Sequence, residues 1–210
     1  MRKKDIRIPN SAPQRIVHFK RGSTKDIMKI VMEVVNKDDL TYQVSDFAQA
    51  FKGSNDDDQY RKLKQLWRWV RDNITYVADG GDLQMIQHPA RLVQSGIGDC
   101  KSFTVFVHFV LKALCIRNVI RFISQNNDQR IDHVYNVAYI GDREVIIDTV
   151  YDRFDREPPL KTRAIDKTPK NYCVVSRTSS NAIGNVQPTT PRGLWLGLGF
   201  LAALLLLSRD

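Results

Sequence analysis

One cysteine in the middle of the chain stands where a nucleophile would be expected. Cys100 follows the glycine-containing turn 95–99 and precedes a long apolar run, 104–111, that predicts a buried helix. The first turn of a helix carries unpaired backbone N–H groups and the positive end of the helix dipole, and both favour a thiolate over a thiol. The sequence therefore predicts that Cys100 is nucleophilic.

A base and an orienting group are expected on a hairpin further along the chain. Two runs rich in β-branched and aromatic residues, 131–140 and 143–150, flank a Gly-Asp pair that suits a two-residue hairpin loop with glycine first. In this register His133 and Asp148 are diagonal neighbours on one face, roughly 7–8 Å apart at the backbone. A loop of odd length would put them on opposite faces.

Cys100, His133 and Asp148 supply a nucleophile, a base and an orienter, the set that thiol-based acyl transfer requires. Each has a simpler role when considered alone: a packed cysteine, a half-buried strand histidine and a hydrogen-bonding aspartate at a strand end. The three together, with a compatible hairpin register, favour the catalytic interpretation. We therefore predict that these are the catalytic residues.

The other histidines and cysteines fit structural positions. We expect His108 in the core, His18 and His88 on the surface or in loops, Cys115 in the core near a helix end and Cys173 in a polar segment. None of the cysteines has metal-ligand spacing with another. The sequence therefore predicts neither a metal nor a cofactor.

Five segments carry a family resemblance within about residues 60–152. They are Gly98-Asp99-Cys100, 133–137 and 147–149, preceded by 67–76 and 88–93. In these segments the chain resembles the transglutaminase-like superfamily. The resemblance implies an α+β, papain-like transglutaminase core in which the cysteine-bearing helix packs on an antiparallel sheet. The family often has a tryptophan before the aspartate strand and a proline after the aspartate; their absence here bears on the substrate cleft rather than on the three catalytic residues.

The resemblance also implies an activity. It indicates a cysteine-dependent enzyme that acts on amide bonds of a protein or peptide substrate through a thioester, without a cofactor. Water as the acceptor makes a peptidase- or amidase-type hydrolase, which is our prediction. An amine acceptor makes a protein-glutamine acyltransferase (transglutaminase), and a non-catalytic binding or assembly module with the same fold is a third alternative.

The carbonyl that Cys100 attacks needs hydrogen-bond donors for its developing negative charge. We expect the backbone N–H of Cys100 to be one donor. Spacing does not choose among four upstream side chains: Trp69, Gln84, Gln87 and Gln94.

Composition and periodicity divide the chain into four parts. We predict a basic arm (1–25), the catalytic domain (26–156), a polar linker (157–192) that holds one short strand at 172–176, and a hydrophobic tail (193–208). Within the catalytic domain, helices are expected at 23–34, 45–51 and 55–70, and strands at 119–124, 132–140 and 143–150. Three cysteines without an apolar leader argue against disulfides, so we expect a reducing compartment.

The tail and the charge point to a membrane surface. The tail, 193–208, carries no charge, lies between Arg192 and Arg209, and as a helix would span about 24 Å. We expect it to anchor the chain as a single-pass or re-entrant helix, with the catalytic domain cytoplasmic because basic residues dominate its N-terminal side. The net charge of +9 suits an anionic membrane face or a solvated surface. We expect no nucleic-acid partner, since no binding motif accompanies the charge.

Overall fold

The computed structural model describes residues 16–20, 24–37, 39–79, 83–126, 130–159 and 163–170. All belong to the first of two units of the chain, Met1–Val175, whereas the second is Ser176–Asp210. The strand expected at 172–176, Cys173 and the hydrophobic tail therefore lie outside the described residues. Among the residues that are described, no helix is both long and apolar enough to cross a membrane.

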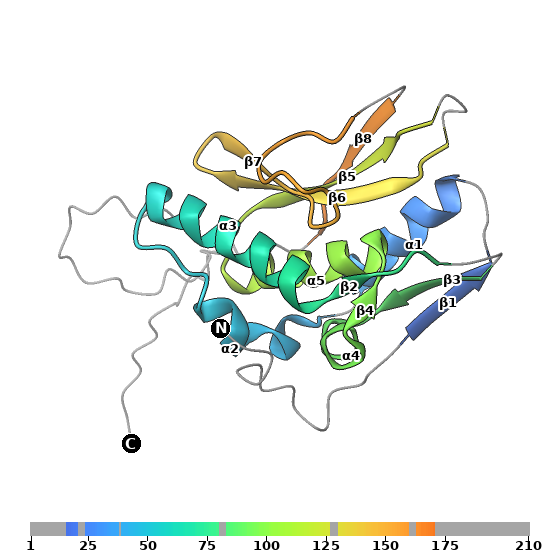
Figure 1. Ribbon diagram of the computed structural model, residues 1–210, viewed down its shortest axis with the longest axis horizontal. Coiled ribbons are helices and arrows are strands. Elements are labelled where there is room, and N and C mark those ends of the chain that lie inside the picture. Colours follow the sequence, from blue (N-terminus) through green and yellow to red (C-terminus); the bar gives the residue numbers. More distant parts are fainter. Residues whose placement is uncertain are drawn as a thin grey trace, which may run out of the picture. The chain divides into compact units, whose positions relative to one another are not determined.

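A four-stranded antiparallel sheet and one buried helix form the centre of the first unit (Figure 1). The strand order is β7 (Arg143–Ile147), β6 (His133–Ile140), β5 (Asn118–Ser124) and β8 (Arg163–Lys167). Helix α5 (Cys100–Ala113) packs on β6, and every residue from Cys100 to Leu111 is buried. Most of its positions from Phe103 to Leu111 are apolar, as expected for a helix that is buried on all sides. The predicted α+β core, with the cysteine helix on an antiparallel sheet, is confirmed.

The β6–β7 hairpin has the predicted register. Gly141 has a positive φ of 60° at the first loop position, a conformation that glycine adopts without strain. Ile140 pairs with Arg143, and the pairing continues to Asn136 opposite Ile147. The two-residue loop therefore keeps His133 and Asp148 on the same side of the hairpin.

The second strand of this hairpin is shorter than predicted. It ends at Ile147 rather than at Val150, because the Asp148 side chain draws the chain into a turn. Its Oδ1 accepts hydrogen bonds from the backbone N–H groups of Val150 at 3.0 Å and Tyr151 at 3.3 Å. Such local side-chain bonds compete with a strand ladder.

Helices surround the remaining sides of α5. They are α1 (Thr24–Lys37), the 3₁₀ turn η2 (Thr41–Gln43), α2 (Ser45–Gln49), α3 (Asp56–Asn73) and α4 (Pro89–Ser95). Figure 1 shows α5 between the four-stranded sheet and the pair α2 and α4, both of which contact it. Helix α3 contacts β6 and β7, the strands of the hairpin, and its Trp69 stacks on Phe106 of α5 with ring centroids 6.0 Å apart. The expected helices are present, although α2 ends two residues early.

Helix α3 begins as its sequence predicts. The Asn55 side chain caps it by accepting a hydrogen bond from the backbone N–H of Asp58 at 2.9 Å. Three aspartates occupy the first turn, where negative charge complements the helix dipole. One face of the helix buries Leu63, Leu66 and Val70 in the core.

Several elements were not predicted. Strand β1 (Ile16–Lys20) lies in the segment assigned to the basic arm and pairs with β3 (Leu83–Gln87), while β2 (Thr75–Tyr76) pairs in parallel with β4 (Ile97–Gly98). Strand β8 falls within the segment assigned to the linker. Its sequence, Arg-Ala-Ile-Asp-Lys, is mostly exposed and polar, as suits the edge of a sheet, so it carries no strong strand pattern.

One cysteine corrects a sequence expectation. Cys115 is exposed rather than part of the core, because α5 ends at Ala113 and Cys115 takes a left-handed conformation with a φ of 56° in the turn that follows. His88 lies in the connection between β3 and α4, consistent with the expected loop position, and its side chain is buried where α4 packs on α5.

Candidate active site

A tight turn delivers Cys100 to the start of α5. Gly96, whose φ of 68° is left-handed, caps the C-terminal end of α4. At Gly98, a Cβ atom would lie 2.4 Å from Cδ1 of Leu92, so a larger residue would require the Leu92 side chain to shift. Asp99 caps α5 by accepting a hydrogen bond from the Ser102 backbone N–H at 3.1 Å. Cys100 is therefore the first residue of the helix, at the positive end of its dipole.

The hairpin brings His133 and Asp148 into direct contact. His133 is the first residue of β6, and its Nε2 lies 2.6 Å from Oδ2 of Asp148. Both side chains are buried. Because Oδ1 of the same carboxylate is held by the turn 148–151, the carboxylate is fixed at both oxygens. Cys100 lies near enough to His133 to influence the pKa of its imidazole.

Helix α3 holds the aspartate loop from the other side. The indole Nε1 of Trp67 donates to the backbone oxygen of Asp148 at 2.6 Å. Arg71 Nη1 donates to the backbone oxygens of the next three residues, at 3.3, 2.9 and 2.8 Å. The hydrogen-bonding role of these two side chains was not predicted from the sequence.

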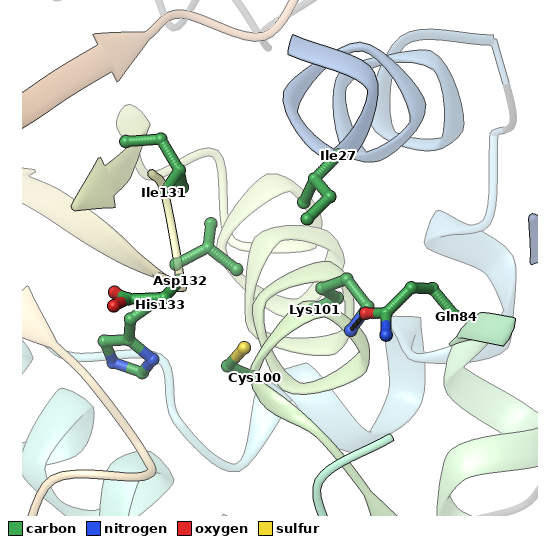
Figure 2. Close-up of a pocket in the computed structure, with 8 residues that line it drawn as sticks. Ile27, Gln84, Cys100, Lys101, Ile131, Asp132 and His133 are labelled. Carbon is green, nitrogen blue, oxygen red and sulfur yellow. Dashed lines mark hydrogen bonds between the residues drawn. The ribbon is translucent and has the colours of Figure 1, made fainter. Parts of the chain in front are cut away.

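Cys100 and His133 share a small pocket of about 50 Å³. Figure 2 shows the thiol at the start of α5 and the imidazole beside it, with Ile27 of α1 reaching toward the pocket from a separate element. The other lining residues are Gln84, Lys101, Ile131, Asp132 and Val134. The pocket therefore has an apolar side and a polar side around the thiol.

The electrostatics of the site favour a charged imidazole. Burial alone lowers the pKa of His133, but its hydrogen bond to Asp148 and its interactions with Cys100 raise that pKa to about 10. At neutral pH the imidazole of His133 is therefore protonated. Tyr76 also borders the site: burial, and then the charges of Cys100 and Asp99, raise its pKa to about 12, so its hydroxyl stays protonated.

A buried lysine next to Cys100 was not predicted from the sequence. Lys101 is only 5% exposed, and its Nζ contacts Asp79 Oδ2 at 3.2 Å, a carboxylate oxygen of Asp99, and Gln84 Oε1 at 2.8 Å. Burial lowers the pKa of Lys101, but the charges of Asp99 and Cys100 outweigh this effect and raise it. The available signal was a lysine in the first turn of a helix that the sequence predicts to be buried.

The positions of Trp69, Gln84, Gln87 and Gln94 distinguish these four candidate donors to the developing negative charge. Gln84 alone among them lines the pocket. The Gln87 amide is engaged by the Ile97 backbone oxygen and the Ser95 hydroxyl, and Gln94 is exposed. Trp69 packs in the core against Phe47, with ring centroids 4.6 Å apart.

His108 is a core residue, as expected. It is 1% exposed, and its Nδ1 lies 3.2 Å from Oδ1 of Asn118. Burial lowers its pKa to about 4, so it is neutral at physiological pH. In the described part of the chain, no three His, Cys, Asp or Glu side chains are grouped as a metal site would require.

The α+β core, with a cysteine at a helix start and a histidine on the strand that the helix packs against, is consistent with the family that the sequence matches. The profile of the transglutaminase-like superfamily matches residues 45–149, and the chain belongs to this superfamily, whose members are in general cysteine-dependent enzymes. A comparison with curated proteins found no match.

Three solved structures are similar to parts of the chain. A candidate cysteine protease from Cytophaga hutchinsonii is 19% identical with a TM-score of 0.42, over 61% of this chain and 49% of that one. A candidate protease from Parabacteroides distasonis is 14% identical (TM-score 0.43, 60% of this chain and 26% of that one). A TGase is 14% identical (TM-score 0.36, 66% and 36%). The chain thus spans half or less of each of these proteins.

Proposed function

We propose that the chain is a membrane-tethered cysteine hydrolase of the peptidase or amidase type, with Cys100, His133 and Asp148 as its catalytic residues. The observation that carries this proposal is the contact between His133 and Asp148, with Nε2 and Oδ2 2.6 Å apart, at the wall of a pocket that His133 shares with Cys100. A nucleophile, a base and an orienter gathered at one pocket are what covalent acyl transfer requires.

In the acylation step, the Cys100 thiolate forms a bond to the carbonyl carbon of the substrate amide, and the π electrons of the carbonyl move to its oxygen. When this intermediate collapses, the carbon–nitrogen bond breaks. The leaving nitrogen takes the proton of the His133 imidazolium, so the amine departs neutral. A thioester on Cys100 and a neutral imidazole remain, while Asp148 keeps the ring oriented.

In the hydrolysis step, neutral His133 removes a proton from the attacking water. The oxygen bonds to the thioester carbon, the carbon–sulfur bond breaks, and Cys100 leaves as a thiolate. The product is a carboxylic acid, and the imidazolium–thiolate pair is restored. An amine in place of water would give acyl transfer by the same sequence of bonds.

The membrane part of the proposal rests on the sequence of the tail. Residues 193–208 carry no charge and are flanked by Arg192 and Arg209. A helix of about 24 Å is slightly shorter than a hydrocarbon core of roughly 30 Å, and local thinning of the bilayer can accommodate such a difference. The basic residues on the N-terminal side favour a cytoplasmic catalytic domain.

A peptide pool tests the reaction class. The full chain in mild detergent, and its Cys100→Ala variant, are incubated with mixed peptides, with and without a primary amine, and the products are read by mass spectrometry. Shortened peptides or deamidated glutamines that require Cys100 support a hydrolase. Glutamines to which the amine has become joined would instead identify the chain as an acyltransferase. The absence of any Cys100-dependent product would favour a non-catalytic module.

A further inference from the structure

The side chain of Gln84 is held in one orientation. Its Oε1 lies 2.8 Å from Nζ of Lys101. An ammonium group only donates hydrogen bonds, so it can hold the oxygen of the amide but not the nitrogen. The chemistry of the pair therefore fixes which end of the amide faces Lys101 (Figure 2). Because Gln84 lines the pocket, its NH₂ group is the end left to donate there.

Lys101 is itself immobilised. Its Nζ lies between the carboxylates of Asp79 and Asp99 and is nearly inaccessible to solvent. Asp79 also accepts a hydrogen bond at 2.6 Å from the backbone N–H of Met85, the residue next to Gln84 on β3. One carboxylate thus ties the lysine and the strand together. This network joins β3 to the first turn of α5, where the nucleophile lies.

We propose that Gln84 is a catalytic residue that donates a hydrogen bond to the oxyanion formed when Cys100 attacks a carbonyl, and that Lys101 is a positioning residue that orients Gln84. The backbone N–H of Cys100 supplies the second donor. This inference rests on the proposed function, since it assigns a role within the same reaction.

A purely structural role for the hydrogen-bonded group of Gln84, Lys101, Asp79 and Asp99 makes a different prediction. Lys101 could serve only to neutralise Asp79 and Asp99, in which case the amide of Gln84 would be replaceable. Gln84→Glu separates the two roles, because a carboxylate keeps the contact with Lys101 but has no hydrogen to donate. Gln94→Glu is the matched control, since Gln94 is exposed and does not line the pocket.

The test compares two reactions of Cys100 in the full chain. Acylation by p-nitrophenyl acetate, followed as released p-nitrophenolate and as an acetyl adduct by mass spectrometry, passes through an oxyanion. Alkylation by iodoacetamide does not. Gln84→Met and Gln84→Glu should slow acylation about 100-fold, the usual effect of losing one such donor. Gln84→Met should leave alkylation within about twofold, and Gln94→Glu should change neither reaction.

A double substitution tests the role of Lys101. If Lys101 acts through Gln84, then Gln84→Met should slow acylation by less than about threefold in a Lys101→Met background, instead of about 100-fold. Equal effects in both backgrounds would overturn the positioning role. The Gln84 variants alone still decide the donor if Lys101→Met does not fold.

The remaining outcomes separate the two proposals. Rapid acylation of Cys100 in both Gln84 variants would overturn the assignment of the donor and leave the proposed function standing. Loss of acylation in Tyr76→Phe, with the Gln84 variants unaffected, would assign the donor to the protonated hydroxyl of Tyr76. Absence of Cys100 acylation in the unmodified chain would contradict the proposed function and this inference together.

Discussion

The indole Nε1 of Trp67 lies 2.6 Å from the backbone oxygen of Asp148, so α3 holds the residue that in turn orients His133. Eighty-one positions separate the two residues in the sequence. Local hydrogen bonds fix the aspartate carboxylate, but this long-range contact fixes where its backbone lies. The geometry of the site therefore depends on how α3 packs against the hairpin.

We expect Trp67→Phe to weaken both stability and activity. The substitution keeps an aromatic ring in the core but leaves a buried backbone oxygen without this donor, a loss of about 1–2 kcal/mol in the free energy of unfolding. Urea unfolding and Cys100 acylation measure the two effects. Tyr60→Phe is the control: Tyr60 lies on the same helix and also packs on Phe154, but has no contact with Asp148. Equal acylation rates in the two variants would contradict the role of Trp67.

Asp148→Asn should show how far His133 depends on the negative charge of residue 148 rather than on the shape of its side chain. The variant keeps the shape of the side chain but removes the negative charge and the carboxylate hydrogen bond that help to raise the pKa of His133. We expect the pKa of His133 to fall from about 10, which an NMR titration of the imidazole would measure. We also expect acylation of Cys100 to slow by about 100-fold or more. Asp142→Asn, an exposed change in the loop of the same hairpin and away from the pocket, should alter neither quantity. An unchanged His133 titration in Asp148→Asn would contradict the assigned contact.

The predictability of the site differs from residue to residue. Cys100, His133 and Asp148 could be related from sequence because helix-start and hairpin signals are local, and a two-residue loop determines the register. The contacts of Trp67, Arg71 and Lys101 could not, since each depends on how two distant elements pack. Strand β8 escaped prediction for a similar reason: its polar residues acquire a strand conformation only by pairing with β5.

His108 should make the protein sensitive to acid. Its folded pKa of about 4 lies below the ordinary value of 6.5, so folding favours the neutral ring. Its contribution to stability is complete above pH 6.5 and is lost as the pH falls toward 4, by on the order of 3 kcal/mol. His108→Gln should flatten this part of a plot of unfolding free energy against pH. The same slope in the variant and the unmodified chain would rule out His108 as its source.

The tail should determine where the protein is found. We expect a chain that ends at residue 190 to appear in the soluble fraction of expressing cells, and the full chain in the membrane fraction, because only the latter carries the uncharged run 193–208. A full chain with Leu204 and Leu205 changed to Lys is a control of unchanged length and should also be released. Equal recovery of the full and truncated chains in the soluble fraction would remove the anchor from the proposal.

The pH dependence of Cys100 alkylation by iodoacetamide tests the central claim most directly, because it reports the thiolate without requiring a substrate. The His133 imidazolium, with a pKa of about 10, should keep the thiolate present, so the rate should be fast and nearly constant from pH 6 to pH 9. In His133→Gln the rate should instead follow an ordinary thiol, with a midpoint near pH 8.5. Exposed Cys115 provides the internal reference. Alkylation of Cys100 in the unmodified chain only above about pH 8, and no faster than Cys115, would contradict the catalytic assignment.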